Sequence, residues 1–196
     1  MALARYLLRV ANKDGYSPRD AERVASTIRK TLGSRESASH FRVATDALEF
    51  NMFARDEAEL NDRRGRLTQS LFKIINVKLL DTPPKIVDKE EALAEGVQLF
   101  NEERFWECHE VLEQAWHVTK GVERDAIQSI ILTAAAFVHY QKDEGEICLS
   151  IMKRARAKMG LVKAYEAIDL EDLERNIDGI LDSEKVQLFR LRTGRV

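Results

Sequence analysis

The segment at residues 122–142 constrains the fold of this chain more than any other, because it is apolar on almost every side. A helix of that composition is normally central and buried in a protein. Its apolar positions are Ala126, Ile127, Ile130, Ile131, Ala134, Ala135, Ala136, Phe137 and Val138. We therefore expect a central helix with other helices packed around it.

Apolar residues at helical spacing also occur on both sides of that segment. The pattern predicts helices near residues 88–101, 104–118 and 145–164, with two short ones around 170–182 and 183–192. The connecting loops are brief, so neighbouring helices should form antiparallel hairpins. The C-terminal part is thus predicted to be helical throughout.

The N-terminal part is predicted to be helical as well. Residues 1–10 have the pattern of an amphipathic first helix, and Ser17-Pro18-Arg19-Asp20 has the residue types of a helix start. Gly33 would end that second helix. Helical spacing then continues along two further stripes. These are Phe41, Ala44, Leu48 and Met52, followed by Leu60, Leu67, Leu71, Ile74, Ile75 and Leu79.

One short run in this region has a second interpretation. Residues 48–53 alternate between apolar and polar types and could form a strand. No partner strand is evident from the pattern, so we favour a helix.

Tandem prolines in Asp81-Thr82-Pro83-Pro84 give the clearest break, because proline cannot continue a helix. We expect an N-terminal helical segment at residues 1–82 and a second helical domain at residues 85–196. The predicted fold class is all-α, with antiparallel helical hairpins packed as a bundle and an N-terminal helical extension.

Composition indicates a soluble globular protein. Of 196 residues, 44% are hydrophobic and 33% are charged, with a net charge of −2. The two cysteines, Cys108 and Cys148, are too far apart for a zinc knuckle or a thioredoxin-type motif, which fits a reducing, cytoplasmic compartment. No apolar run reaches the roughly 18 residues of a membrane span, so no membrane association is expected.

The candidate site lies in residues 100–116, where aromatic residues, a histidine and several glutamates are concentrated. On a helix, His109 and Glu113 are one turn apart, at the border of the apolar face that carries Phe105 and Trp116. Cys108 falls on the core side as an inert thiol, and Glu107 is expected to point away from the core.

The central helix adds polar residues to this site. An antiparallel hairpin would place Trp116 opposite Arg124 and Glu113 near Gln128, with His139 closing the other end. The predicted pocket therefore consists of His109, Glu110, Glu113, Trp116, Arg124, Gln128 and His139.

Three chemistries fit such a cluster. A metal site of the di-metal type needs Glu-x-x-His on two helices, which neither His109 nor His139 provides, so we predict no metal and no other cofactor. His109 with a carboxylate is a possible general base, and Arg124 with Trp116 could hold an anionic or planar ligand. Alternatively, the polar residues satisfy one another and fix the helix register without any ligand.

Three groups of residues between positions 88 and 160 form a specific pattern: Leu99-Phe100-Asn101, then Phe105-Trp106-Glu107-Cys108-His109-Glu110-Val111-Leu112-Glu113 with Trp116, and then Glu123-Arg124-Asp125 with Gln128 and His139. In this pattern residues 88–160 resemble a bacterial and archaeal family, the domain of unknown function 309. The chain departs from the family pattern at Cys108, Ser129 and Leu132, where Ala, Gly and Gln are usual. The resemblance implies packed helical hairpins and no particular reaction.

Our leading functional hypothesis is a non-enzymatic module that binds a protein partner or a small ligand, with the N-terminal segment as a second surface or a homodimer contact. One alternative is a hydrolase-type or metal-assisted enzyme that uses His109 as general base with Glu113 or Glu110. A second is nucleic-acid binding through Arg63, Arg64 and Arg66. Neighbouring acidic residues dilute that basic cluster, so nucleic acid is the least favoured partner. The catalytic residues, if any, are unknown.

Overall fold

The chain divides into two compact units. One comprises Met1–Pro84 with Gln141–Asp143, and the other comprises Lys85–Tyr140 with Glu144–Val196. We call them the sheet unit and the helical unit. The computed structural model describes residues 3–80, 88–160, 164–165 and 168–194. The break predicted at Asp81–Pro84 lies outside these residues.

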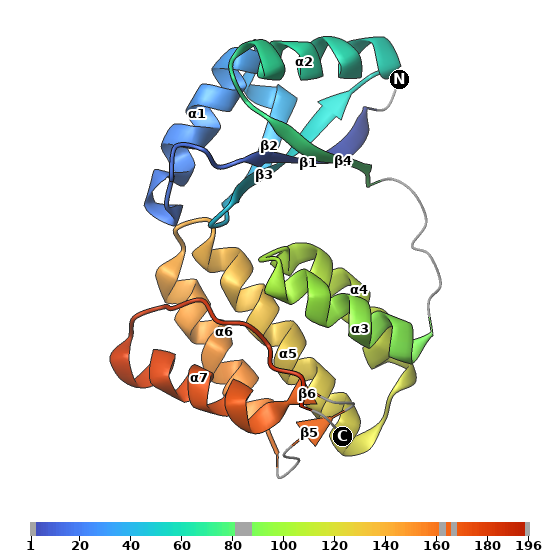
Figure 1. Cartoon of the computed structure of the whole chain (residues 1–196), viewed down its shortest axis with the longest axis vertical. Coiled ribbons are helices and arrows are strands. Elements are labelled where there is room, and N and C mark those ends of the chain that lie inside the picture. The colour runs from blue at the N-terminus through green and yellow to red at the C-terminus, as the bar shows by residue number, and fades with distance from the viewer. Residues whose placement is uncertain (1–2, 81–87, 161–163, 166–167, 195–196) are drawn as a thin grey trace. The chain divides into compact units, whose positions relative to one another are not determined.

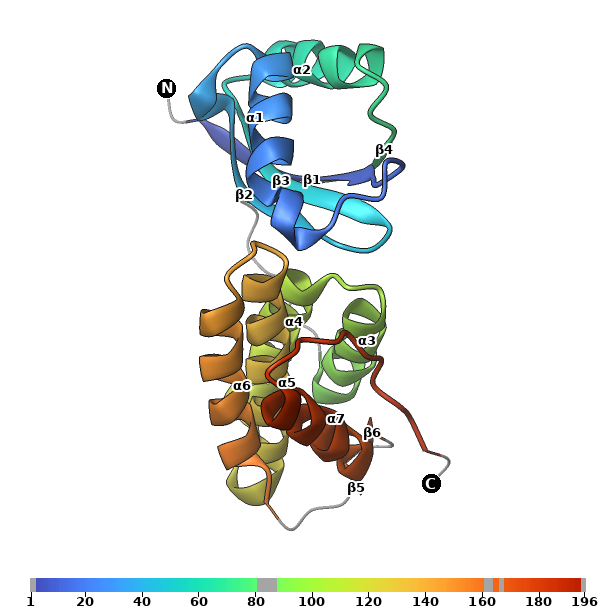
Figure 2. The same ribbon diagram turned by 90° about the vertical axis from the view of Figure 1, so that its left-hand side faces the viewer.

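The sheet unit contains a four-stranded antiparallel sheet with strand order β2-β3-β1-β4 (Figure 1). Its elements are β1 (Ala4–Ala11), α1 (Ala21–Leu32), β2 (Ala38–Val43), β3 (Ala47–Ala54), α2 (Glu57–Gln69) and β4 (Ile74–Leu79). Helices α1 and α2 pack on one face of the sheet (Figure 2). Leu8, Phe50 and Ile28 are fully buried in the core between these layers.

The all-α prediction is therefore wrong for the N-terminal part. Residues 4–11, predicted as a helix, form β1, and the stripe from Phe41 to Met52 is divided between β2 and β3. Strand β3 lies between β1 and β2 and is buried along nearly its whole length, and its polar residues Glu49 and Asn51 are buried as well. The alternating run at residues 48–53, set aside for want of a partner, is this strand.

The long helix predicted between Leu60 and Leu79 is also wrong. Helix α2 ends at Gln69, and residues 74–79 form the edge strand β4. The chain turns at Leu71, whose φ of 68° is left-handed and stops the helix. By contrast, the second predicted helix forms: a 3-10 turn at Pro18–Asp20 leads into α1, and Asp20 accepts from the N–H of Ser17. Gly33, in the left-handed region, ends this helix as predicted.

The helical unit confirms the C-terminal helices. Its elements are α3 (Lys89–Asn101), α4 (Phe105–Val118), α5 (Gly121–Tyr140), α6 (Gly145–Lys158) and α7 (Leu170–Ser183), with two-residue strands β5 (Ala164–Tyr165) and β6 (Ile168–Asp169). In the described part of the chain no helix is both long and apolar enough to cross a membrane.

The last predicted helix, at residues 183–192, does not form; residues 185–192 have no regular secondary structure. The segment is held at one end by Asn101, whose side chain donates to the carbonyl of Leu191 (3.1 Å) and accepts from its N–H (2.7 Å). Its Phe189 ring contacts Phe100 and Phe137, with centroids 5.7 and 5.3 Å apart. The segment is thus anchored by contacts to α3 and α5 instead of helical hydrogen bonds.

Helices α3 and α4 approach closely at Gly96. A Cβ atom on Gly96 would lie 2.4 Å from Cδ2 and 2.6 Å from Cγ of Leu112, which is closer than real carbon contacts allow. Glycine is thus required here for lack of space and not for backbone conformation. Leu112 is itself almost fully buried and has little room to move.

We expect Gly96→Ala to destabilise the protein by about 1–3 kcal/mol, because overpacking outweighs the better helix propensity of alanine. Gly179→Ala on α7 is the matched control, since nothing lies within 4 Å of that position. The control should be neutral or stabilising by up to about 1 kcal/mol. Urea unfolding measures both, and equal effects would contradict the close approach.

Candidate functional site

Helix α4 presents two different faces within the helical unit. Phe105, Cys108 and Leu112 are buried in the core, and this fixes the rotation of the helix. His109 is therefore half-buried at the border of the core, while Glu110 is exposed. This agrees with the rotation expected from helical spacing.

His109 lies between two carboxylates. Its Nδ1 is 3.7 Å from Oε1 of Glu110, and its Nε2 is 3.8 Å from Oε1 of Glu113. Potential metal-ligating atoms of the three residues lie within 4.8 Å of one another. One imidazole and two carboxylates suit a transition metal such as Zn²⁺. However, all three ligands come from one helix, and an ion-pair cluster on a partly exposed helix face explains the same arrangement.

The two carboxylates change the ionisation of His109. The nearby carboxylates of Glu110 and Glu113 raise the pKa of His109, with the larger effect from Glu110, and partial burial opposes them less strongly. The imidazolium form is thus favoured. A histidine that holds its proton more tightly is less available as a general base near neutral pH.

Trp116 and Arg124 face each other across the α4–α5 hairpin, as predicted. The guanidinium carbon of Arg124 lies 3.8 Å from the centroid of the Trp116 ring, a close cation–π contact. Among the described residues, Arg124 makes no ion pair, and the buried Nε1–H of Trp116 donates to no acceptor. Both residues therefore have donor groups that no described residue accepts from.

The other two predicted pocket residues lie apart from these contacts. Gln128 is half-buried one turn after Arg124, and its amide bonds to no described residue. His139 is bonded through Nδ1 to Oε2 of Glu144, at 2.5 Å, near the start of α6. A cavity of about 50 Å³ in this unit is lined instead by other residues, Ala126 and Ser129 among them. The candidate site is thus a surface patch, which we call the α4–α5 patch: His109, Glu110, Glu113, Trp116, Arg124 and Gln128.

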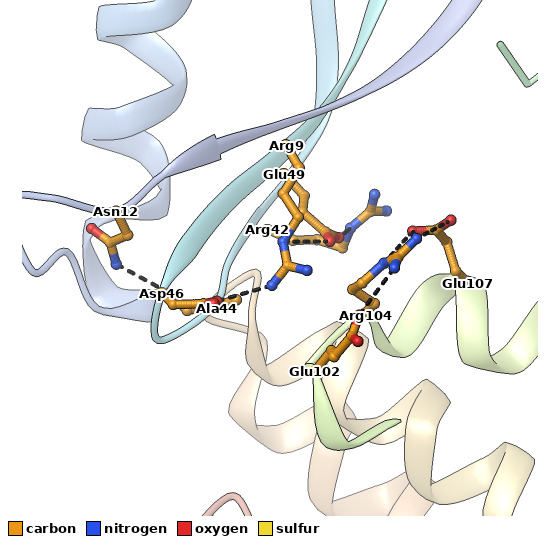
Figure 3. Close-up of polar contacts among 9 residues, drawn as sticks. All are labelled: Arg9, Asn12, Arg42, Ala44, Asp46, Glu49, Glu102, Arg104 and Glu107. Carbon is orange, nitrogen blue, oxygen red and sulfur yellow. Dashed lines mark hydrogen bonds and ion pairs between the residues drawn. The ribbon is translucent and has the colours of Figure 1, made fainter. Parts of the chain in front are cut away.

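Sequence reasoning missed the best-paired carboxylate of α4. Glu107, expected to point away from the core, is only 3% exposed. Arg104 donates from Nε and Nη2 to its two carboxylate oxygens, at 2.8 and 3.0 Å, and from Nη1 to Glu102 (Figure 3). Burial lowers the pKa of Arg104, but the bonds and charges of Glu107 and Glu102 outweigh it and raise the pKa. The spacing of Arg104 and Glu107, three positions apart, is the sequence signal that could have predicted this ion pair.

The sheet unit contains a second charged group that the helical prediction could not reveal. Glu49 on β3 lies between Arg42 on β2 and Arg9 on β1, in register across three strands (Figure 3). Its Oε2 is 3.2 Å from Nε of Arg42, and Asp46 bonds to Arg9 at 2.9 Å. These residues lie opposite one another only because the segments are strands.

The basic cluster proposed for nucleic acid is largely neutralised. Arg63 pairs with Glu59 at 2.8 Å and also donates to the Phe53 carbonyl, while Arg66 pairs with Asp62 at 2.9 Å. Arg64 is left exposed. One exposed arginine does not make the basic surface that nucleic-acid binding requires.

Both thiols are buried in the helical unit, as expected for Cys108. Burial raises the pKa of Cys108, and it raises the pKa of Cys148 to about 12. Thiols in that state are protonated at neutral pH and are poor nucleophiles.

Comparison with known families identifies part of this unit. Residues 93–150 match the family described as "Domain of unknown function (DUF309)", so this segment, from α3 into α6, is a DUF309 domain. The match includes His109, Trp116, Arg124 and the other patch residues. No curated protein matches the chain.

Removing the Glu107 carboxylate should destabilise the helical unit. We expect Glu107→Ala to cost about 2 kcal/mol, because it leaves Arg104 partly buried without its bidentate partner. We expect a smaller loss of stability than for a fully buried ion pair, since the Arg104 side chain is 22% exposed and solvent screens its charge. Glu146→Ala, at an exposed position on α6, is the control and should be neutral. Thermal unfolding would distinguish them.

The ionisation of His109 can be tested by NMR. We expect its titration midpoint to lie above 6.5 and to fall in Glu110→Gln, since the carboxylate of Glu110 contributes most to the raised pKa. A raised folded-state pKa stabilises the protein below pH 6.5, and that contribution is lost as the pH rises through the folded pKa. The pH dependence of stability should therefore weaken in the same variant. An unchanged midpoint would contradict the assigned ion pair.

Proposed function

We propose that the helical unit is a non-enzymatic binding module whose ligand or partner presents a carboxylate or another anionic group to Arg124 and Trp116. The cation–π contact between these residues, with donors left unused on both, is the observation that carries the proposal. A guanidinium resting on an aromatic ring is well oriented to bind a planar anion through its outer N–H groups.

The unused indole N–H of Trp116 supports the proposal that this site is completed by a ligand. A buried donor without an acceptor costs roughly 1–3 kcal/mol, so structures retain one where it serves a purpose. Arg124 covers the ring and is held there by no ion pair among the described residues, so it can move aside when an acceptor arrives. A carboxylate could then accept from both Trp116 and Arg124.

Charge along α4 would orient such a ligand. Glu113 precedes Trp116 by three residues and lies on the same side of the helix, and Glu110 is one turn before Glu113. An anionic group is thus attracted at the Arg124 end and repelled at the glutamate end. The proposal therefore favours a ligand or partner segment with its negative charge confined to one end.

The raised pKa of His109 and the protonated thiols favour binding over catalysis. His109, Cys108 and Cys148 are therefore poor candidates for a general base or a nucleophile at neutral pH. Nucleic acid is not favoured either, because the glutamates of α4 would repel a phosphate backbone.

Fluorescence of Trp116 tests this function. In a Trp106→Phe background Trp116 is the remaining tryptophan, so its emission reports the patch. We expect hexaglutamate to change the emission saturably and hexaglutamine to have no effect. Arg124→Gln should weaken the response at least about tenfold, a loss typical of one charge-assisted hydrogen-bonded contact, and Arg124→Lys should retain part of it.

Arg154→Gln is the matched control, because it removes the same charge from an exposed position on α6. Equal loss of binding in Arg124→Gln and Arg154→Gln would show that only net charge matters and would contradict the proposed site. An emission change with hexaglutamine as large as that with hexaglutamate would also contradict it.

A further inference from the structure

The sheet unit contains a broad depression that runs along one side of α1 and past its C-terminal end. Its volume is about 580 Å³, and it is lined by Glu22, Ser26, Arg29, Lys30, Gly33, Ser34 and Arg35. Ligand sites commonly have volumes of about 300–1,000 Å³. Three of the lining residues are cations and one is an acid, so the depression is basic although the protein as a whole has a net charge of −2.

Arg29 is fixed in position within this depression. Its Nε donates to the carbonyl of Ala38 at 3.2 Å, and its guanidinium carbon lies 4.9 Å from the centroid of the Phe41 ring. These two contacts hold the guanidinium plane and leave its terminal N–H groups for another acceptor. An arginine held in this way loses less conformational entropy when it binds an anion.

The cations of the depression lack the carboxylate partners found elsewhere in this unit. Arg23, Arg55 and Arg63 each pair with an acidic residue three or four positions away. No such ion pair forms at Arg29, Lys30 or Arg35 among the described residues. Three unneutralised cations around one hollow produce a local positive potential that attracts anions.

A fourth cation lies next to the same place. Nη1 of Arg66, on α2, is 3.0 Å from the position that a Cβ atom of Gly33 would occupy. Glycine at this turn, with φ of 83°, therefore both ends α1 and leaves room for Arg66 to cross the helix end. Arg66 is already paired with Asp62, so it adds to the potential and is not counted as a ligand-binding residue.

Basic residues in the last turn of a helix ordinarily offset its dipole, and Arg29 and Lys30 lie in that turn. Arg35 does not offset the dipole of α1, because it follows Gly33 and belongs to the next short turn. It nevertheless lines the depression. Ser26 and Ser34 add hydroxyl groups to the wall. Cations from two successive elements, with hydroxyls between them, match the oxygens of phosphate better than a single carboxylate.

We propose that this depression binds a compact polyphosphate group, held by Arg29, Lys30 and Arg35. The residues that line the depression include no aromatic side chain, and the neighbouring ring of Phe41 is in contact with Arg29, so the lining offers no surface for stacking a base. Recognition would therefore rest on phosphate oxygens alone. This site is separate from the α4–α5 patch, and neither proposal depends on the other.

Titration calorimetry of the full chain with sodium tripolyphosphate tests the proposal. We expect saturable 1:1 binding that weakens with salt, and amide NMR shifts concentrated at Ser26, Gly33 and Ser34. Lys30→Gln with Arg35→Gln should weaken binding at least about tenfold, since two charge-assisted contacts are lost. Both side chains are exposed, so the double variant should remain folded.

The matched control is Arg19→Gln with Arg64→Gln, which removes the same charge from exposed positions on the sheet unit outside the depression. It should bind tripolyphosphate as the unmodified protein does. Equal weakening in both double variants, or no binding at millimolar tripolyphosphate, would overturn the proposal. A single-stranded oligonucleotide that binds more tightly with increasing length, while tripolyphosphate does not bind, would overturn it in favour of a nucleic-acid surface.

Discussion

The helical unit depends on the burial of α5, and above all on Phe137. The ring of Phe137 contacts Phe105 from α4 at 5.0 Å, Phe100 from α3 at 5.8 Å and Phe189 from the segment after α7 at 5.3 Å. These contacts determine which side of α4 faces inward, since Phe105 and Leu112 must reach the same core. Because this side of α4 faces the core, the opposite side is polar, and the positions of His109 and Trp116 are set by the same rotation of the helix. The candidate patch is thus a consequence of the packing.

The helices of this unit could be predicted from sequence because each carries its own signal. Apolar residues recur every three or four positions, and short turns impose antiparallel neighbours. The strands of the sheet unit depend more on their partners. Strand β3 is buried between β1 and β2, and its partner β1 lies more than 30 residues earlier in the sequence. The alternating run at residues 48–53 therefore has a partner, β1, that its own neighbourhood in the sequence does not reveal.

As with the fold, only part of the candidate site could be predicted from the sequence. The contact between Trp116 and Arg124 followed from the short connection between α4 and α5, which leaves little freedom in how the two helices pair. The burial of Glu107 did not follow from helical rotation, because Arg104 just before the helix supplies the partner that makes a buried carboxylate tolerable. His139 was expected at the patch but bonds to Glu144, a residue beyond the end of its helix.

The bond between Asn101 and Leu191 joins residues 90 positions apart in sequence. Phe189, just before Leu191, supplies one of the rings around Phe137. During synthesis the sheet unit's strands and helices emerge together, whereas the helices of the other unit must wait with an incomplete core until this segment leaves the ribosome. Contacts of such separation also slow folding. The α3–α6 helices that match DUF309 would then spend that interval as a partly open bundle, in which chaperones have access to the central helix.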